Sequence, residues 1–188
     1  MSRIRHSLLH GLLVLLLSSC RQSNSDLEKV DHVWSGIGFG IPMSVELYQI
    51  DVSLVGRIDI ESYIHELELA SSLYSDSSEL SILNREKVLM NPSRLFLSLL
   101  EKAKILSERT LGYYQPAIHG AWSAMELDEL SDEHVEAADM LNVEISGDRV
   151  TLGNPLTELS FNAIAQGYLT DRVAQYLREL DVNSAILY

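Results

Sequence analysis

The part of the sequence with the clearest chemical potential is Leu159–Asp171, which reads LSFNAIAQGYLTD. Leu159 and Phe161 alternate with a polar residue as in a strand, and the small residues of Asn162–Gly167 predict a loop that opens into a helix. Such a junction leaves backbone N–H groups at a helix N-terminus, which suits a phosphate. The alternative is an ordinary strand–helix junction with small residues for close packing. From these residues alone the ordinary junction is favoured, because one glycine-containing loop is a weak signal.

A second group of interest is Gly112–Ala117, which places two tyrosines and a proline directly after a predicted helix. Trp122 and Met125 follow as a short apolar patch. Neighbouring aromatic side chains can form the wall of a site for a planar ligand, although they more often cover the edge of a core. His119 lies between the two, and a surface histidine without a ligand is the simpler interpretation of it.

Other patterns that carry chemistry are absent from the sequence. Cys20 is the only cysteine and the six histidines are scattered, so there is neither a zinc-binding pattern nor an internal disulfide. No nucleophile elbow and no Walker lysine loop occurs. The glycines of Ser35–Gly40 precede a strand rather than follow one, which argues against a dinucleotide fingerprint.

The composition points to one acidic domain. The chain has 188 residues, 46% of them hydrophobic, and a formal net charge of -13. This length and hydrophobic content suit a single packed core. The negative charge repels polyanions, so no nucleic-acid partner is expected. A phosphate ligand would need local backbone donors or a metal, because the net negative charge of the protein repels an anion.

The first twenty residues have the pattern of a bacterial lipoprotein signal peptide. Arg3 and Arg5 precede the apolar run Leu8–Leu17, which is too short to span a bilayer comfortably. The run ends in Leu-Ser-Ser-Cys, which resembles a lipobox with Cys20 as the lipidation site. The alternatives are a secretory signal with an incidental cysteine and a buried helix.

Lipidation would place the protein outside the cytoplasm. Acyl chains such as palmitate on Cys20 would tether it to a membrane, and residues 21–34 would form a polar tether. We therefore expect a bacterial periplasmic location, with the lipid anchor in the inner membrane on its periplasmic side. The domain itself is expected over residues 35–188.

Periodicity and capping residues predict the elements of this domain. A half-buried strand is expected around Val45, and a helix is expected from Ile60 to about Ser71. Ser77 or Ser78 is expected to cap a short helix that ends at Asn84. The further predicted elements are a helix capped by Ser93 that stops at Gly112, an acidic helix over Ser131–Leu141, a β-hairpin around Gly147-Asp148, a helix with the apolar face Leu169, Val173, Leu177 and Leu180, and a strand over Ser184–Tyr188.

This order of strands and helices predicts a mixed α/β (α+β) fold in which sheet and helices form a sandwich. The sequence stops inside the last predicted strand, without a turn, cap or tail. A buried strand at a chain end is one interpretation. The abrupt stop also indicates an incomplete domain, and we expect this second interpretation to hold.

Three blocks, in order, resemble motifs of the ApbE family of FAD:protein FMN transferases. Ser72–Asn84 is similar to "S-x-Y…S-E-[LI]-S-x-[LF]-N", Thr110–Pro116 to "T-x-G-A-F-D-P", and Ala163–Asp171 to "G-I-A-K-G-Y-x-x-D". Phe39-Gly40-Ile41 occupies the place of the family's "M-G-T". The third block is the most specific, and together the blocks reverse the preference for an ordinary junction at Leu159–Asp171.

The chain departs from the family pattern at several positions. Gln166 replaces a lysine, Gln115 an aspartate, and Ser160 the aspartate before the third block. The version "A-Q-G-Y-x-T-D" resembles a subgroup associated with the maturation of respiratory enzymes such as nitrous oxide reductase. The family's later motifs, including the aspartate/threonine pair that completes the magnesium site, do not occur before Tyr188.

The resemblance implies a T-fold-like ApbE domain that transfers FMN from FAD to a threonine hydroxyl of a target protein, with Mg²⁺ bound and AMP released. The implied target is a periplasmic or membrane flavoprotein. The resemblance places the main-chain carbonyl of Ala163 on magnesium. It places the following side chains beside FAD: Tyr74, Tyr113, Tyr114, Gln115 and Gln166. It assigns no catalytic residue.

Two other functions stay open. The first is a non-catalytic flavin-binding lipoprotein that assists the maturation of a respiratory enzyme, which the glutamines at positions 115 and 166 and the serine at position 160 favour. The second is a periplasmic lipoprotein without a cofactor, which predicts no change in flavin fluorescence on mixing.

Overall fold

A computed structural model describes residues 30–182 and 184–188. The expected signal peptide, the lipidation site Cys20 and most of the expected tether lie outside these residues. Within the described part of the chain, no helix has both the length and the apolar character needed to cross a bilayer. The first strand begins at His32, inside the segment assigned to the tether.

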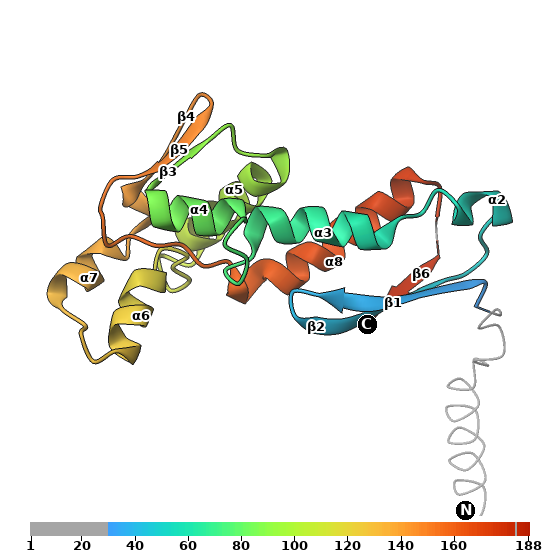
Figure 1. Ribbon diagram of the computed structural model, residues 1–188, viewed down its shortest axis with the longest axis horizontal. Helices are drawn as coiled ribbons and strands as arrows, with labels where there is room; N and C mark the ends of the chain where they lie inside the picture. The colour runs from blue at the N-terminus through green and yellow to red at the C-terminus, as the bar shows by residue number, and fades with distance from the viewer. Residues whose placement is uncertain (1–29, 183) are drawn as a thin grey trace, which may run out of the picture. The chain divides into compact units, whose positions relative to one another are not determined.

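The first sheet has three antiparallel strands in the order β1-β2-β6 (Figure 1). β1 (His32–Gly38) and β2 (Ile41–Leu47) pair in register from His32↔Leu47 to Gly38↔Ile41, and β6 (Ala185–Leu187) pairs with the far edge of β2. The turn Phe39-Gly40 has positive φ at both residues, 53° and 75°, as a two-residue hairpin with right-handed twist requires. Val45 and Leu47 are fully buried, which confirms the predicted strand.

The glycines of β1 explain why this strand was not expected. A Cβ atom on Gly36 would lie 2.4 Å from Trp34 Cζ2, and one on Gly38 would lie 2.7 Å from Met43 Sδ and 2.9 Å from Ile64 Cγ2. The glycines are therefore places where side chains cross over the strand, not the loop signals that they resemble in the sequence.

Two long helices pack against each other, and the first of them also packs against β1 of this sheet (Figure 1). The predicted helix is confirmed as α3 (Ile60–Ser71), which follows the short α2 (Val52–Val55). α8 (Asn162–Glu179) buries Leu169, Val173 and Leu177 of its predicted face. The rings of Tyr63 and Tyr176 stack with centroids 4.6 Å apart, which joins α3 to α8.

The second sheet is antiparallel in the order β3-β5-β4. It consists of β3 (Val88–Met90), β4 (Val143–Ser146) and β5 (Arg149–Leu152), and the β4–β5 hairpin turns at Gly147 as predicted. The helices of this part are α4 (Glu79–Glu86), α5 (Arg94–Arg109), α6 (His119–Glu126), α7 (Asp132–Ala137) and the 3₁₀ turn η2 (Met140–Asn142). The mixed α/β class is confirmed, and one continuous apolar core joins both sheets to the helices.

The predicted caps are present. Ser78 Oγ accepts the N–H of Ser81 at the start of α4, and Ser93 Oγ accepts the N–H of Phe96 at the start of α5. The carboxylate of Glu79 accepts hydrogen bonds from the N–H and hydroxyl of Ser93, so the starts of the two helices are joined. Caps of this kind stabilise a helix by about 1 kcal/mol.

The prediction for Leu159–Gly167 is wrong in two respects. Residues 159–161 are not a strand, and α8 already begins at Asn162, so the expected loop is the first turn and a half of a helix. The buried side chain of Asn84 accepts the N–H of Leu159 at 2.7 Å and donates to its C=O at 2.9 Å. Because Asn84 satisfies both backbone groups, Leu159 and Phe161 are fully buried without a neighbouring strand.

Candidate functional site

An open cavity of about 690 Å³ lies where four segments of the chain meet. These are the turn after α3, the loop after α5, helix α6 and the start of α8. The lining residues are Leu73, Tyr74, Gly112, Tyr113, Tyr114, Gln115, Ile118, His119, Trp122, Glu126, Ser160, Asn162 and Ala163. Four of the five side chains expected beside FAD, together with Ala163, therefore lie at one site.

The aromatic side chains of this cavity differ in exposure. Tyr74 and Tyr113 are 82% and 95% exposed, so their rings are free to contact a ligand. Tyr114 is half-buried, and its hydroxyl is buried without a hydrogen-bond partner. Burial raises the pKa of Tyr114 to about 12, because desolvation disfavours the phenolate. The loop thus presents one exposed and one half-buried tyrosine ring.

Local hydrogen bonds set the positions of these loops. The N–H of Tyr114 donates to Thr110 Oγ1 at 3.0 Å, and the N–H of Tyr74 donates to Ser72 Oγ at 3.1 Å. Gln115 Oε1 accepts the N–H of Ala117 at 3.2 Å, so this carboxamide is folded onto its own loop. A glutamine at this position therefore acts partly as a turn-forming residue, as an aspartate can.

The N-terminus of α8 faces the cavity. Asn162 and Ala163 are exposed and line it. The backbone N–H groups of Ile164 and Ala165 donate to the C=O of Phe161, whereas Ala163 donates no hydrogen bond from its N–H within the described residues. A free N–H at the start of an 18-residue helix is a favourable donor for an anionic group.

Gln166 is the one expected FAD residue that does not line the cavity. It is exposed on α8, within the first turn and a half of the helix, and its backbone C=O accepts the hydroxyl of Thr170 at 3.0 Å. Because the segment is helical rather than a loop, Gln166 projects from the cylinder about one turn beyond Ala163.

The described residues contain no group of three or more His, Cys, Asp or Glu side chains placed to hold a metal ion. Ala163, the expected magnesium ligand, would contribute its backbone C=O. This carbonyl lies in the helical ladder, but a carbonyl oxygen has two lone pairs and can accept a second contact. Ala163 is therefore compatible with a metal whose other ligands come from phosphate oxygens and water.

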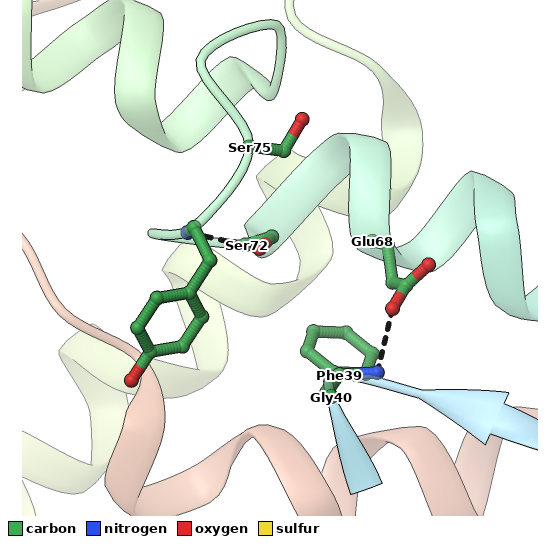
Figure 2. Close-up of a pocket in the computed structure, with 6 residues that line it drawn as sticks. Phe39, Gly40, Glu68, Ser72 and Ser75 are labelled. Atoms are coloured by element: carbon green, nitrogen blue, oxygen red, sulfur yellow. Dashed lines mark hydrogen bonds between the residues drawn. The ribbon is translucent and has the colours of Figure 1, made fainter.

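A second, smaller cavity of about 490 Å³ shares the lining residue Tyr74 with the first, and Figure 2 shows the residues that line it. It is lined by Phe39, Gly40, Glu68, Ser72, Tyr74 and Ser75. Glu68 Oε1 accepts the N–H of Phe39 at 2.6 Å, which ties the β1–β2 turn to α3. The Phe39-Gly40 turn thus lies near the first motif block although Ser72 comes 32 positions after Gly40 in the sequence.

Helix α6 is the part of the site that sequence reasoning missed. Ile118, Trp122 and Glu126 recur every four residues and line the cavity together with His119. This spacing is a helical signal that could have identified the helix, whereas the sequence placed Trp122 only in a short apolar patch. Trp122 is 53% exposed, so it does not simply cover the core.

Comparisons with known proteins agree on one family. The model of the ApbE family matches residues 39–188. Similar solved structures are the flavin transferase ApbE from Vibrio cholerae (TM-score 0.68, 19% identity, 83% of this chain and 56% of that chain), the apo form of the flavinyl transferase ApbE from Pseudomonas stutzeri (0.70, 21%, 85% and 58%) and the ApbE protein from Thermotoga maritima (0.67, 18%, 84% and 56%).

These identities show the fold alone, and the chain spans 56–58% of the length of these three solved chains. Among proteins with curated descriptions, none matches this sequence.

Proposed function

The chain belongs to the ApbE family, and from this premise we propose that it acts in flavin transfer as an FAD:protein FMN transferase. In this reaction FMN moves from FAD to a threonine hydroxyl of a target protein, with Mg²⁺ bound and AMP released. One observation carries the proposal. Tyr74, Tyr113, Tyr114, Gln115 and Ala163, which the family motifs assign to FAD and its metal, line one cavity although they come from three separate segments.

The cavity has the size and composition that a flavin dinucleotide needs. Its volume of about 690 Å³ lies within the range of roughly 300–1,000 Å³ typical of ligand clefts. Exposed tyrosine rings favour a planar heteroaromatic ring, and the helix N-terminus favours the pyrophosphate. This local donor is needed because the chain as a whole is acidic and would repel an anionic ligand.

The proposed reaction is a phosphoryl transfer, so the task of the protein is mainly to position the groups. The threonine oxygen forms a bond to the phosphorus of the FMN half, and the bond from this phosphorus to the bridging oxygen of the pyrophosphate breaks. AMP leaves with that oxygen, and the hydroxyl proton passes to AMP or to solvent. Bound Mg²⁺ would neutralise the charge of the pyrophosphate, with the C=O of Ala163 among its ligands.

The chain's own residues contribute binding and orientation. The N–H of Ala163 at the helix start would donate to a pyrophosphate oxygen, and the tyrosines that line the cavity would hold the ring system; the unused N–H and the shared cavity support these roles. Gln166 can donate a hydrogen bond but carries no charge, so it stabilises an anion less than the lysine found in most family members. Weak binding of FAD is therefore expected.

Transfer is tested directly by mass spectrometry. The full chain is incubated with FAD, Mg²⁺ and a threonine-containing acceptor peptide, and the peptide is examined for an added FMN group while AMP is quantified. FMN on the threonine peptide, with none on the matching valine peptide and none when EDTA replaces Mg²⁺, supports the proposal. Peptide and AMP levels that stay at background with saturating FAD contradict transferase activity.

A second function is favoured by the departures from the family pattern. Gln115, Ser160 and Gln166 replace charged residues, and the described residues contain no cluster of acidic metal ligands. These features favour a periplasmic lipoprotein that binds flavin without catalysis and assists the maturation of a respiratory enzyme. Retention of FAD in equilibrium dialysis without release of AMP would select this function over transfer.

The location proposed for either function is the periplasmic side of the inner membrane, with a lipid on Cys20 as the anchor. The charge, apolar run and lipobox of the first twenty residues support this proposal. Expression in a bacterium fed labelled palmitate tests it. Label is expected on the full chain and should be lost from Cys20→Ser, with the protein then recovered in the periplasmic fraction. An unlabelled full chain contradicts the anchor.

A further inference from the structure

Helix α6 supplies one whole wall of the 690 Å³ cavity. Ile118 and His119 lie at the start of this helix, Trp122 lies one turn further, and Glu126 lies at its end. All four line the cavity. None of them belongs to the motif blocks that connect the chain to flavin, so the role of this wall is not given by the resemblance.

One hydrogen bond orients Trp122 on this wall. Its indole Nε1–H donates to Glu126 Oε1 at 2.8 Å, a charge-assisted bond between residues one turn apart. The side chain is nevertheless 53% exposed. The carboxylate of Glu126 binds the N–H edge of the indole, and much of the indole surface is exposed. This exposed surface can contact a planar group.

Helix α6 packs closely on the segment that leads into α8. A Cβ atom on Gly120 would lie 2.2 Å from the C=O oxygen of Leu156, so the backbone of α6 packs directly on the 153–157 turn. The N–H of His119 donates to the C=O of Glu158 at 3.1 Å, and the N–H of Ser160 donates to the C=O of Pro116 at 2.8 Å. These bonds join α6 to the segment that leads into α8.

We propose that Trp122, oriented by Glu126, is a ring-stacking residue of this cavity that binds one of the two planar heteroaromatic rings of FAD. The inference rests on the proposed function, because it requires that the cavity takes a flavin dinucleotide. The isoalloxazine and adenine rings share the required chemistry, and each is present alone in a smaller ligand. FMN carries only the first ring and ADP only the second.

The size of the effect follows from known stacking energies. Stacking of a base on an aromatic side chain contributes about 1–3 kcal/mol, so removal of the indole should weaken binding by roughly 5- to 150-fold. Trp122→Leu removes the aromatic face, and Trp122→Phe keeps a smaller one. Glu126→Leu keeps the indole but removes the hydrogen bond to its N–H, and should lower the affinity for FAD less than Trp122→Leu does.

The experiment is calorimetric titration of the full chain, wild type and variants, with FAD, FMN and ADP. For Trp122→Leu we expect a 5- to 150-fold loss of FAD affinity, with the same loss for one of the two smaller ligands and an unchanged affinity for the other. Trp122→Phe should recover most of the affinity. Trp34→Phe, which changes the only other tryptophan and does not line the cavity, should bind all three ligands normally.

Three results would overturn the inference. Unchanged FAD binding by Trp122→Leu would show that the indole makes no contact. Equal losses for FMN and ADP would show that the residue only supports the shape of the cavity. A wild-type chain that binds none of the three ligands would contradict the proposed function as well, which distinguishes that failure from the first two.

Discussion

The side chain of Asn84 forms two hydrogen bonds with the backbone of Leu159, 75 residues away in the sequence. Asn84 lies in α4, and Leu159 lies just before the residues that line the cavity. Both residues are buried, and the carboxamide of Asn84 supplies the two backbone hydrogen bonds that a neighbouring strand would otherwise supply to Leu159. This pair connects the first motif block to the segment that leads into the third and sets the path of the chain into α8.

Replacement of Asn84 should therefore destabilise the fold. Asn84→Ala leaves the N–H and C=O of Leu159 buried without partners, at a cost of about 1–3 kcal/mol for each group. Urea unfolding monitored by circular dichroism measures this loss. As a control, Asn154→Ala removes an asparagine that bonds only within its own turn and should cost less. Equal stability of the two variants would contradict the role given to Asn84.

Two glycines in helices should respond in opposite ways to alanine. Gly120→Ala brings a methyl group against the Leu156 carbonyl, so α6 must shift, and both stability and FAD affinity should fall. Gly167→Ala meets no atom within 4 Å in α8 and should stabilise the fold by about 0.5–1 kcal/mol. Thermal unfolding of both variants, followed by FAD titration of Gly120→Ala, tests the seating of α6.

The buried hydroxyl of Tyr114 predicts a pH dependence of stability. Its pKa is raised to about 12 in the fold, whereas an unfolded tyrosine titrates near 10. Between these values the unfolded chain releases a proton that the folded chain keeps, so stability should fall as the pH rises from about 10 to 12. Below pH 10 this residue contributes no pH dependence.

Tyr114→Phe isolates this effect, because it removes an unpartnered hydroxyl and leaves the ring. We expect the variant to be at least as stable as the wild type at pH 8 and to lose less stability between pH 10 and 12. The pKa of Tyr48 is also raised to about 12, mainly by its hydrogen bond to Glu46. The effect of Tyr114 is therefore measured as the difference in stability between wild type and Tyr114→Phe at each pH. Parallel stability curves would argue against a buried Tyr114 hydroxyl.

Gln166→Lys should increase the affinity for FAD if the start of α8 meets the pyrophosphate. Since Gln166 is exposed and does not line the cavity, a flexible lysine is needed to reach the ligand, and the gain should shrink as salt is added. Equilibrium dialysis at two salt concentrations measures this. Gln175→Lys adds the same charge about two and a half turns further along α8, and an equal gain there would indicate a general charge effect.

The parts of the protein that local signals encode were predicted from the sequence. Apolar periodicity identified α3, α5 and α8, Ser78 and Ser93 marked the starts of α4 and α5, and Gly147 marked the hairpin turn. These signals act between residues a few positions apart, so they can be read without knowledge of the fold. The motif blocks likewise indicated the family, which the match over residues 39–188 confirms.

The remaining features were decided only by the tertiary structure, because they depend on contacts between distant segments. Gly38 lies in a strand where the side chain of Ile64 from α3 packs over it, and Asn84 satisfies the buried backbone of Leu159 just before α8. Tyr74, Trp122 and the tyrosines of the loop after α5 line one cavity only because the helices pack together. The sequence motifs indicated which residues are candidates for a flavin site, and packing decided which of them share one cavity.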